Sequence, residues 1–140
     1  MLSAIVVDDE TDLRTSLSEY LEIKGVSILA TGQNGKDAFE LYQHHKPDVV
    51  LLDFLMPQYD GLYAITRIRD FDPDAKIVML TASVGDDTFK RLVDNDVSGI
   101  IYKPYDMDVL INNIERVIAG ERIIPKYRPW KNSARLDIPQ

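Results

Sequence analysis

The chain has 140 residues, a length that suits one domain with a single core. It contains no cysteine, which excludes disulfides and thiolate metal sites. Its apolar runs are only a few residues long, whereas a helix needs roughly 20 apolar residues to span a bilayer. The N-terminus lacks the charged and then apolar pattern of a signal peptide. We therefore expect a cytoplasmic protein without a membrane segment.

Charge is distributed unevenly along the chain. Residues 1–120 hold 11 Lys and Arg against 21 Asp and Glu, a net charge of −10, whereas residues 121–140 hold 5 against 2, a net charge of +3. Contacts to phosphate supply most of the affinity of nucleic-acid-binding proteins, and an acidic body lacks the basic surface that they need. We expect no direct nucleic-acid binding by residues 1–120.

Short apolar runs of strand length alternate with segments of helical spacing. In chain order the predicted elements are a strand at Ile5–Val7, a helix from about Leu13 to Leu21 that ends at Gly25, a strand at Val26–Ala30, a helix around Ala38–Tyr42, a strand at Val49–Leu52, a helix around Leu62–Ile68, a strand at Ile77–Leu80, a short helix at Thr88–Val93, a strand at Ile100–Tyr102 and a helix at Val109–Ile118 that ends at Gly120. Val49–Leu52 is apolar throughout, which is typical of a strand covered on both faces of a parallel sheet.

This alternation predicts an α/β fold, with a (βα)5 doubly wound, five-stranded parallel sheet of the flavodoxin-like order 2-1-3-4-5. In such sheets ligands bind at the carboxyl ends of the strands. Functional residues are therefore expected directly after the apolar runs.

Candidate site residues follow four of the five predicted strands, whereas the second strand is followed by Thr31 and Gly32, which offer no ionisable group. The candidates are Asp8, Asp9 and Glu10 after the first strand, Asp53 after the third, Thr81 after the fourth and Lys103 after the fifth. Each has an ordinary structural explanation alone, such as an acidic helix start, a turn, a cap or a strand end. Because the predicted topology brings all of them to one edge of the sheet, we interpret them as a site, with Glu10 assigned to a helix start.

Phosphoryl transfer to a carboxylate is the chemistry that fits these residue types. Clustered carboxylates without Cys or His indicate Mg²⁺, which takes one or two protein carboxylates, waters and phosphate oxygens. Asp53 can act as a nucleophile toward phosphorus, and Mg²⁺ and Lys103 can stabilise the charge of the transferring group. The Thr81 hydroxyl can bind a phosphoryl oxygen once one is present.

Four motifs in this order resemble the receiver domain of two-component response regulators, the CheY-like superfamily. They are VVDDE at residues 6–10, DxxMPxxDG at Asp53–Gly61, LTA at residues 80–82 and KP at residues 103–104. The resemblance covers residues 1–120 and leaves residues 121–140 as a C-terminal extension.

The resemblance implies a role for each matching residue. It assigns Asp53 as the phosphoacceptor, and it assigns Mg²⁺ to the carboxylates of Asp8, Asp9 and Asp53 and the backbone carbonyl of Leu55. Thr81 matches the switch hydroxyl of the family, and Lys103 matches its site lysine. The Lys103–Pro104 bond is expected to be cis, as it is at this place in the family.

The resemblance also implies partners. A sensor histidine kinase or a phosphotransfer protein would donate the phosphoryl group from a phosphohistidine. The face formed by the fourth helix, fifth strand and fifth helix would then change its binding of a downstream protein or a fused output domain, and a phosphorylation-dependent homodimer is a further option. No external substrate is expected, so the chain is predicted to be a signalling switch that assists its own phosphorylation and dephosphorylation rather than an enzyme.

One position departs from the family pattern. Receiver domains usually carry Tyr or Phe three residues before the lysine, and this chain has Ile100 there. Tyr102 lies two residues later and therefore on the same face of the predicted strand. Our hypothesis is that Tyr102 carries part of the output surface. The alternative is a tyrosine that only covers an edge strand.

Two other classes of function share features of this site. A phosphatase of the haloacid dehalogenase type also uses an aspartate nucleophile with Mg²⁺, but it needs a second acid two residues later, where this chain has Leu55. A degenerate receiver that only binds proteins is disfavoured because the residue types of the acceptor site are all present.

The C-terminal extension combines three prolines with apolar side chains that are costly to expose, namely Ile123, Ile124, Tyr127 and Trp130. One hypothesis is that the extension docks, on its own domain or on a second copy. The alternative is a disordered linker toward an output domain.

Overall fold

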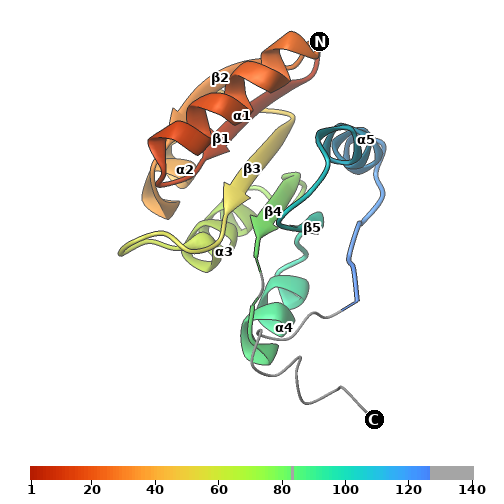
Figure 1. Cartoon of the computed structure of the whole chain (residues 1–140). Helices are drawn as coiled ribbons and strands as arrows, with labels where there is room; N and C mark the ends of the chain where they lie inside the picture. The colour runs from red at the N-terminus through yellow and green to blue at the C-terminus, as the bar shows by residue number, and fades with distance from the viewer. Residues whose placement is uncertain (83, 127–140) are drawn as a thin grey trace.

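The computed structural model describes residues 1–82 and 84–126, which form a parallel sheet in the order β2-β1-β3-β4-β5 (Figure 1). The strands are β1 (Ser3–Val7), β2 (Ser27–Gly32), β3 (Val49–Asp53), β4 (Ile77–Thr81) and β5 (Gly99–Tyr102). The helices are α1 (Thr11–Ile23), α2 (Gly35–His45), α3 (Gly61–Phe71), α4 (Asp86–Asp94) and α5 (Met107–Ile118). The predicted (βα)5 fold and strand order are confirmed.

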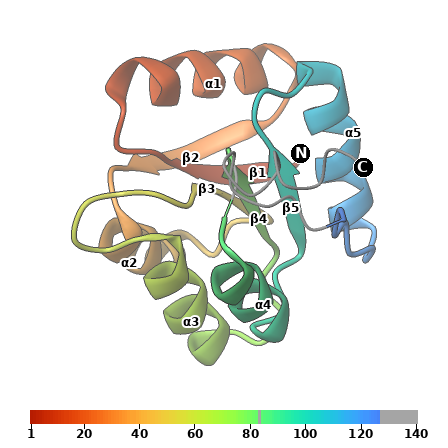
Figure 2. The same cartoon turned by 60° about the horizontal axis from the view of Figure 1, so that its bottom comes forward.

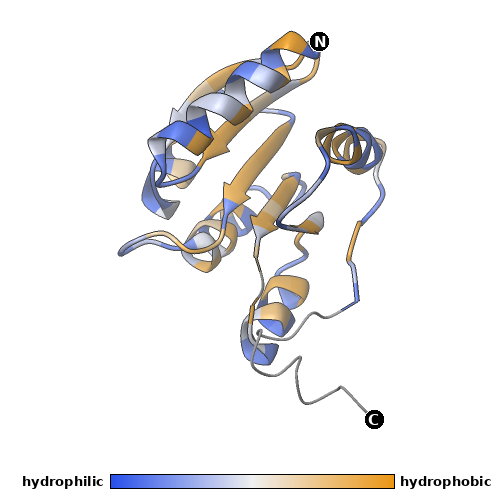
Figure 3. Cartoon of the chain, in the orientation of Figure 1, coloured by the Kyte–Doolittle hydropathy of each residue, from blue (hydrophilic) through white to orange (hydrophobic). Residues whose placement is uncertain are grey.

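The sheet is covered on both faces. Helices α1 and α5 lie on one face, and α2, α3 and α4 lie on the other (Figure 2). Hydrophobic residues are concentrated on the strands (Figure 3). Within β3, Val50 and Leu52 belong to the core on the α2–α3–α4 side, whereas Val49 and Leu51 belong to the core on the α1–α5 side. The apolar run at Val49–Leu52 is therefore explained by burial on both faces.

Two strands extend one residue beyond the predicted apolar runs. Asp53 is the last residue of β3 and pairs with Leu80, and Thr81 is the last residue of β4 and pairs with Tyr102. A polar side chain ends the apolar run in the sequence, but its backbone can still pair with the neighbouring strand. Both side chains consequently start from a fixed strand position rather than from a loop.

A buried tyrosine links α2 to the end of α3. The Tyr42 hydroxyl donates a hydrogen bond of 2.5 Å to Oδ2 of Asp72, the residue that follows α3. This bond holds the pKa of Asp72 below its usual value of 3.8. Burial and the same bond raise the pKa of Tyr42 well above its usual range.

Replacement of Tyr42 by phenylalanine should lower the free energy of unfolding by about 1.5–3 kcal/mol at neutral pH, the usual contribution of a hydrogen bond to a charged group. A carboxylate with a depressed pKa stabilises the fold above its unfolded pKa of 3.8, and this contribution disappears as the pH falls through the folded pKa. The loss should therefore shrink in acid. Urea unfolding followed by circular dichroism, at neutral pH and in acid, measures this loss of stability.

Tyr20→Phe is the matched control for Tyr42→Phe, because the Tyr20 hydroxyl makes only an exposed 3.5 Å contact with Asp108. A loss at Tyr42 that is the same in acid and at neutral pH would contradict the assigned bond.

Among the described residues, no helix combines the length and the apolar character that crossing a membrane requires.

Candidate functional site

The carboxyl ends of β1, β3, β4 and β5 meet at one edge of the sheet. The ladders pair β1 with β3, β3 with β4 and β4 with β5. Asp8 follows β1, Asp53 ends β3, Thr81 ends β4 and Lys103 follows β5. Four residues that lie far apart in the sequence are therefore placed in neighbouring strand positions.

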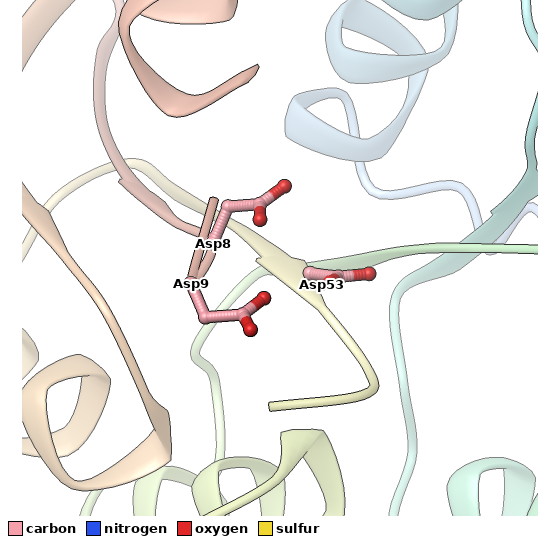
Figure 4. A group of neighbouring side chains, drawn as sticks. All are labelled: Asp8, Asp9 and Asp53. Carbon is pink, nitrogen blue, oxygen red and sulfur yellow. The ribbon is translucent and has the colours of Figure 1, made fainter. Parts of the chain in front are cut away.

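Three carboxylates form the centre of this edge. One oxygen each of Asp8, Asp9 and Asp53 lies within 4.8 Å of the other two, and the three side chains extend side by side in the same direction (Figure 4). Asp8 is buried, Asp53 is half-buried and Asp9 is exposed. Ligands on opposite sides of an octahedral Mg²⁺ lie about 4 Å apart, because each Mg–O bond is about 2.0–2.1 Å. The carboxylate oxygens are therefore close enough to share such an ion with small side-chain adjustments.

Lys103 supplies the positive charge of the site. Its Nζ lies 3.2 Å from Oδ1 of Asp53 and 4.0 Å from Oδ2 of Asp8. The Lys103–Pro104 peptide is cis, which confirms that prediction. The backbone N–H of Lys103 also donates to the carbonyl of Thr81 at 2.8 Å, so the lysine is fixed to the neighbouring strand.

The pKa of Asp53 is raised above its usual value of 3.8. Burial is the largest cause, since it disfavours the charged carboxylate, and the negative charge of Asp8 acts in the same direction. Lys103 opposes both through its charge and its hydrogen bond. Asp53 thus lies in an environment where additional positive charge would be stabilising.

Backbone contacts hold Asp8 in position. Its N–H donates to the carbonyl of Gly32 at 3.1 Å, and its own carbonyl accepts a 2.7 Å bond from Nη1 of Arg14. Its Oδ1 accepts the N–H of Glu10 at 2.9 Å, and Glu10 immediately precedes α1 as expected. Sequence reasoning missed Arg14, because an arginine that binds a backbone carbonyl leaves no pattern of residue types.

The loop between β3 and α3 is fixed at both ends. The N–H of Gly61 donates to the carbonyl of Phe54 at 2.8 Å, and the N–H of Gly35 donates to the carbonyl of Tyr59 at 2.6 Å. A Cβ atom on Gly35 would lie 2.4 Å from the carbonyl oxygen of Asp60, so only glycine allows this approach. The loop contains Leu55, whose side chain is 60% exposed. Its carbonyl remains a proposed ligand.

A cavity of about 510 Å³ opens beside the site, between α1 and the start of α5. Its apolar lining includes Leu13, Leu17 and Met107. It is also lined by Asp8, Lys103 and Tyr105, on the side of the carboxylate cluster. The pKa of Tyr105 is raised, mainly by burial and further by the charges of Asp8 and Asp53. Sequence reasoning missed Tyr105, although its place two residues after Lys103 was an available signal.

The fold and the site together define a class: doubly wound α/β domains that present a carboxylate cluster and a lysine at the carboxyl edge of the sheet. Residues 4–115 match the family described as the response regulator receiver domain. The chain belongs to this family. Its members are phosphoacceptor switches in signal transduction rather than classical enzymes.

Two relatives illustrate the match. The chain is 33% identical over 125 residues to the response regulator GacA of Pseudomonas aeruginosa, across 89% of this chain and 58% of GacA. It is 31% identical over 116 residues to the chemotaxis protein CheY of Listeria monocytogenes, across 83% of this chain and 98% of CheY. The chain therefore spans little more than half of GacA and nearly all of CheY.

Solved structures agree with this assignment. The CheX–CheY–BeF3–Mg²⁺ complex of Borrelia burgdorferi contains a chain that superposes with a TM-score of 0.77 at 26% identity, over 83% of this chain and 88% of that one. The flavodoxin-like, CheY-like fold is thereby confirmed.

Proposed function

We propose that this chain is a phosphorylation-dependent signalling switch in which Asp53 accepts the phosphoryl group. One observation carries the proposal: the half-buried carboxylate of Asp53 lies against two further carboxylates, with the Lys103 ammonium 3.2 Å away. In a cluster of carboxylates without a cation, the negative charges would only repel one another. The combination of clustered carboxylates and one lysine instead suits a site that binds a cation and a phosphoryl group together.

Asp8, Asp9, Asp53 and the carbonyl of Leu55 are the proposed ligands of Mg²⁺. When bound, Mg²⁺ would offset the repulsion of the carboxylates and the negative charge of the transferring group. The CheY complex named above contains Mg²⁺ and BeF3, according to its description. The present chain brings three carboxylates together in the corresponding fold.

Transfer requires one bond to form and one to break. A carboxylate oxygen of Asp53 attacks phosphorus, and the P–N bond to the donor imidazole breaks, so the electron pair returns to the imidazole nitrogen. Lys103 then binds an oxygen of the phosphoryl group, and the Thr81 hydroxyl donates to another. Dephosphorylation is a separate reaction: water attacks phosphorus and gives up a proton to the solvent, the aspartyl P–O bond breaks, and inorganic phosphate and the Asp53 carboxylate are released.

Lys103 and Thr81 connect the phosphoryl group to the proposed output face. Lys103 directly follows β5, and Thr81 ends β4, the strand that leads to α4, so new contacts of both side chains with a phosphoryl group would be passed on to these elements. The proposed output face comprises α4, β5 and α5. Ile100 is buried in β5, and Tyr102 is half-buried and packs against the same core cluster. Tyr102 remains our candidate for part of the output surface in place of the usual aromatic residue.

The proposed donor is a sensor histidine kinase or a phosphotransfer protein. The apolar cavity between α1 and α5 borders Asp8 and Lys103, so a donor that covers it would bring its phosphohistidine to the acceptor. We further propose that the receiver comprises residues 1–120, that it acts in the cytoplasm without binding nucleic acid itself, and that its downstream partner is a protein target or a fused output domain. In the C-terminal extension, Ile123 and Ile124 pack against the domain, whereas Tyr127 and Trp130 lie outside the described residues.

Incubation with acetyl phosphate, with and without Mg²⁺, tests the proposal. Intact-mass measurement should show one added phosphoryl group only when Mg²⁺ is present. Asp53→Asn, which preserves shape but not the nucleophile, should show none. Multiple turnover of the donor without a phosphorylated resting protein would favour a phosphatase, and the absence of any reaction would favour a degenerate receiver.

A further inference from the structure

The edge of β5 that faces away from β4 is covered by the chain itself. After α5 the chain turns at Gly120, which has a φ of 103°, and returns along β5, where it is the blue segment of Figure 1. Ile123 forms a parallel bridge with Gly99. The N–H of Ile123 donates to the carbonyl of Ser98 at 2.9 Å, and the N–H of Ile100 donates to the carbonyl of Ile123 at 3.0 Å.

The side chains of this segment alternate across the sheet as those of a strand do. Ile123 packs against the core under α1 and α5, whereas Ile124 packs against the core under α2, α3 and α4. Consecutive residues of a strand point to opposite faces. Ile123 and Ile124 therefore close both sides of the sheet at its β5 edge.

Arg122 extends the contact to α4. Its Nε donates to the carbonyl of Val97, and its Nη2 donates to the carbonyl of Val93, each at 3.3 Å. Val93 lies in the last turn of α4, where carbonyl groups lack helical partners and positive charge is favourable. The segment thus contacts both β5 and the C-terminal end of α4.

The contact is short. Pro125 has no N–H with which to continue the ladder, and the bridge at Ile123 is isolated. Segments held by few hydrogen bonds open at a small fraction of the global unfolding free energy. We therefore expect this segment to leave the β5 edge more easily than the domain unfolds.

We propose that the β5 edge and the C-terminal end of α4 form a docking surface for an extended peptide that consists of an arginine followed by two branched aliphatic residues. In this structure Arg122–Ile124 of the same chain occupy the surface. Recognition is by strand addition: the backbone pairs with the sheet edge, and the two aliphatic side chains enter opposite faces. If the proposed function holds, any partner of the α4–β5–α5 face competes with this segment.

The full-length variant Ile123→Pro tests the docking surface, because proline removes the N–H that binds Ser98. The probe is a blocked synthetic peptide with the sequence of residues 120–125, GERIIP. We expect saturable binding to the variant, with shifts of the Ser98 and Ile100 backbone amide signals. Binding to the wild-type chain should be about tenfold weaker or more, since the tethered segment competes at high effective concentration. Lys126→Pro, three residues beyond the bridge, should behave as wild type.

Equal binding of the peptide to wild type and Ile123→Pro, or no binding to a variant with an unchanged melting temperature, would overturn the proposal. Hydrogen exchange of the wild-type chain provides a second measurement that does not depend on the variant folding. The Ile123 amide should exchange about tenfold more slowly than in the peptide, and an amide that exchanges at the peptide rate would contradict the bridge. Neither measurement involves phosphorylation of Asp53, so failure here is distinct from failure of the proposed function.

Discussion

Replacement of Lys103 by methionine is expected to slow phosphorylation of Asp53 by acetyl phosphate about 100-fold. Methionine has a similar length but no charge. Removal of a single group that stabilises developing negative charge in a transfer reaction usually costs about 10²–10³ in rate. Lys103 is the cation that lies 3.2 Å from Asp53, so this loss should fall on the chemical step.

The same substitution should strengthen Mg²⁺ binding. The Lys103 ammonium lies within 4.0 Å of both Asp8 and Asp53, where it repels a second cation. Slower transfer together with a lower dissociation constant for Mg²⁺ distinguishes Lys103 from a metal ligand, because loss of a ligand lowers both the transfer rate and the affinity for Mg²⁺. Initial rates by intact mass and Mg²⁺ titration by calorimetry measure the two effects.

Lys90→Met is the matched control for Lys103→Met, because Lys90 is exposed on α4. It should leave both the rate and the metal affinity unchanged. A rate for Lys103→Met within threefold of the wild-type rate would show that this lysine does not act on the transferring group.

Sequence patterns sufficed for the residues whose placement follows from topology. Parallel strands have their carboxyl ends at one edge of the sheet, so the sequence alone predicts that Asp8, Asp53, Thr81 and Lys103 lie together. The cis peptide before Pro104 followed from the family resemblance.

Contacts between loops were beyond the reach of sequence patterns. The N–H of Gly35, at the start of α2, donates to the carbonyl of Tyr59 in the loop between β3 and α3, and Arg14 donates to the carbonyl of Asp8. Backbone carbonyls are the same in every residue type, so composition and periodicity contain no signal for such bonds. The apolar character of Ile123 and Ile124 indicated that they need a partner surface but did not identify β5 as that surface.

A reversal of stability is expected at Asp9. In the absence of Mg²⁺, Asp9→Asn should be more stable than wild type by about 1 kcal/mol, because one of three like charges whose oxygens lie within 4.8 Å of one another is removed. Mg²⁺ at 100 times its dissociation constant should stabilise the wild type by about 2.7 kcal/mol. The variant should bind Mg²⁺ about 100-fold more weakly and therefore gain only about 0.4 kcal/mol at the same concentration.

The order of the two melting temperatures should therefore invert when Mg²⁺ replaces a chelator. Asp12→Asn is the matched control, since Asp12 is exposed in the first turn of α1 and interacts favourably with the helix dipole. Its loss should slightly destabilise the chain in both conditions, without inversion. If Asp9→Asn gains no stability in chelator and Mg²⁺ stabilises it as much as wild type, Asp9 is not a ligand. Because removing the charge acts in opposite directions with and without the ion, the inversion distinguishes a shared cation site from an acidic helix start.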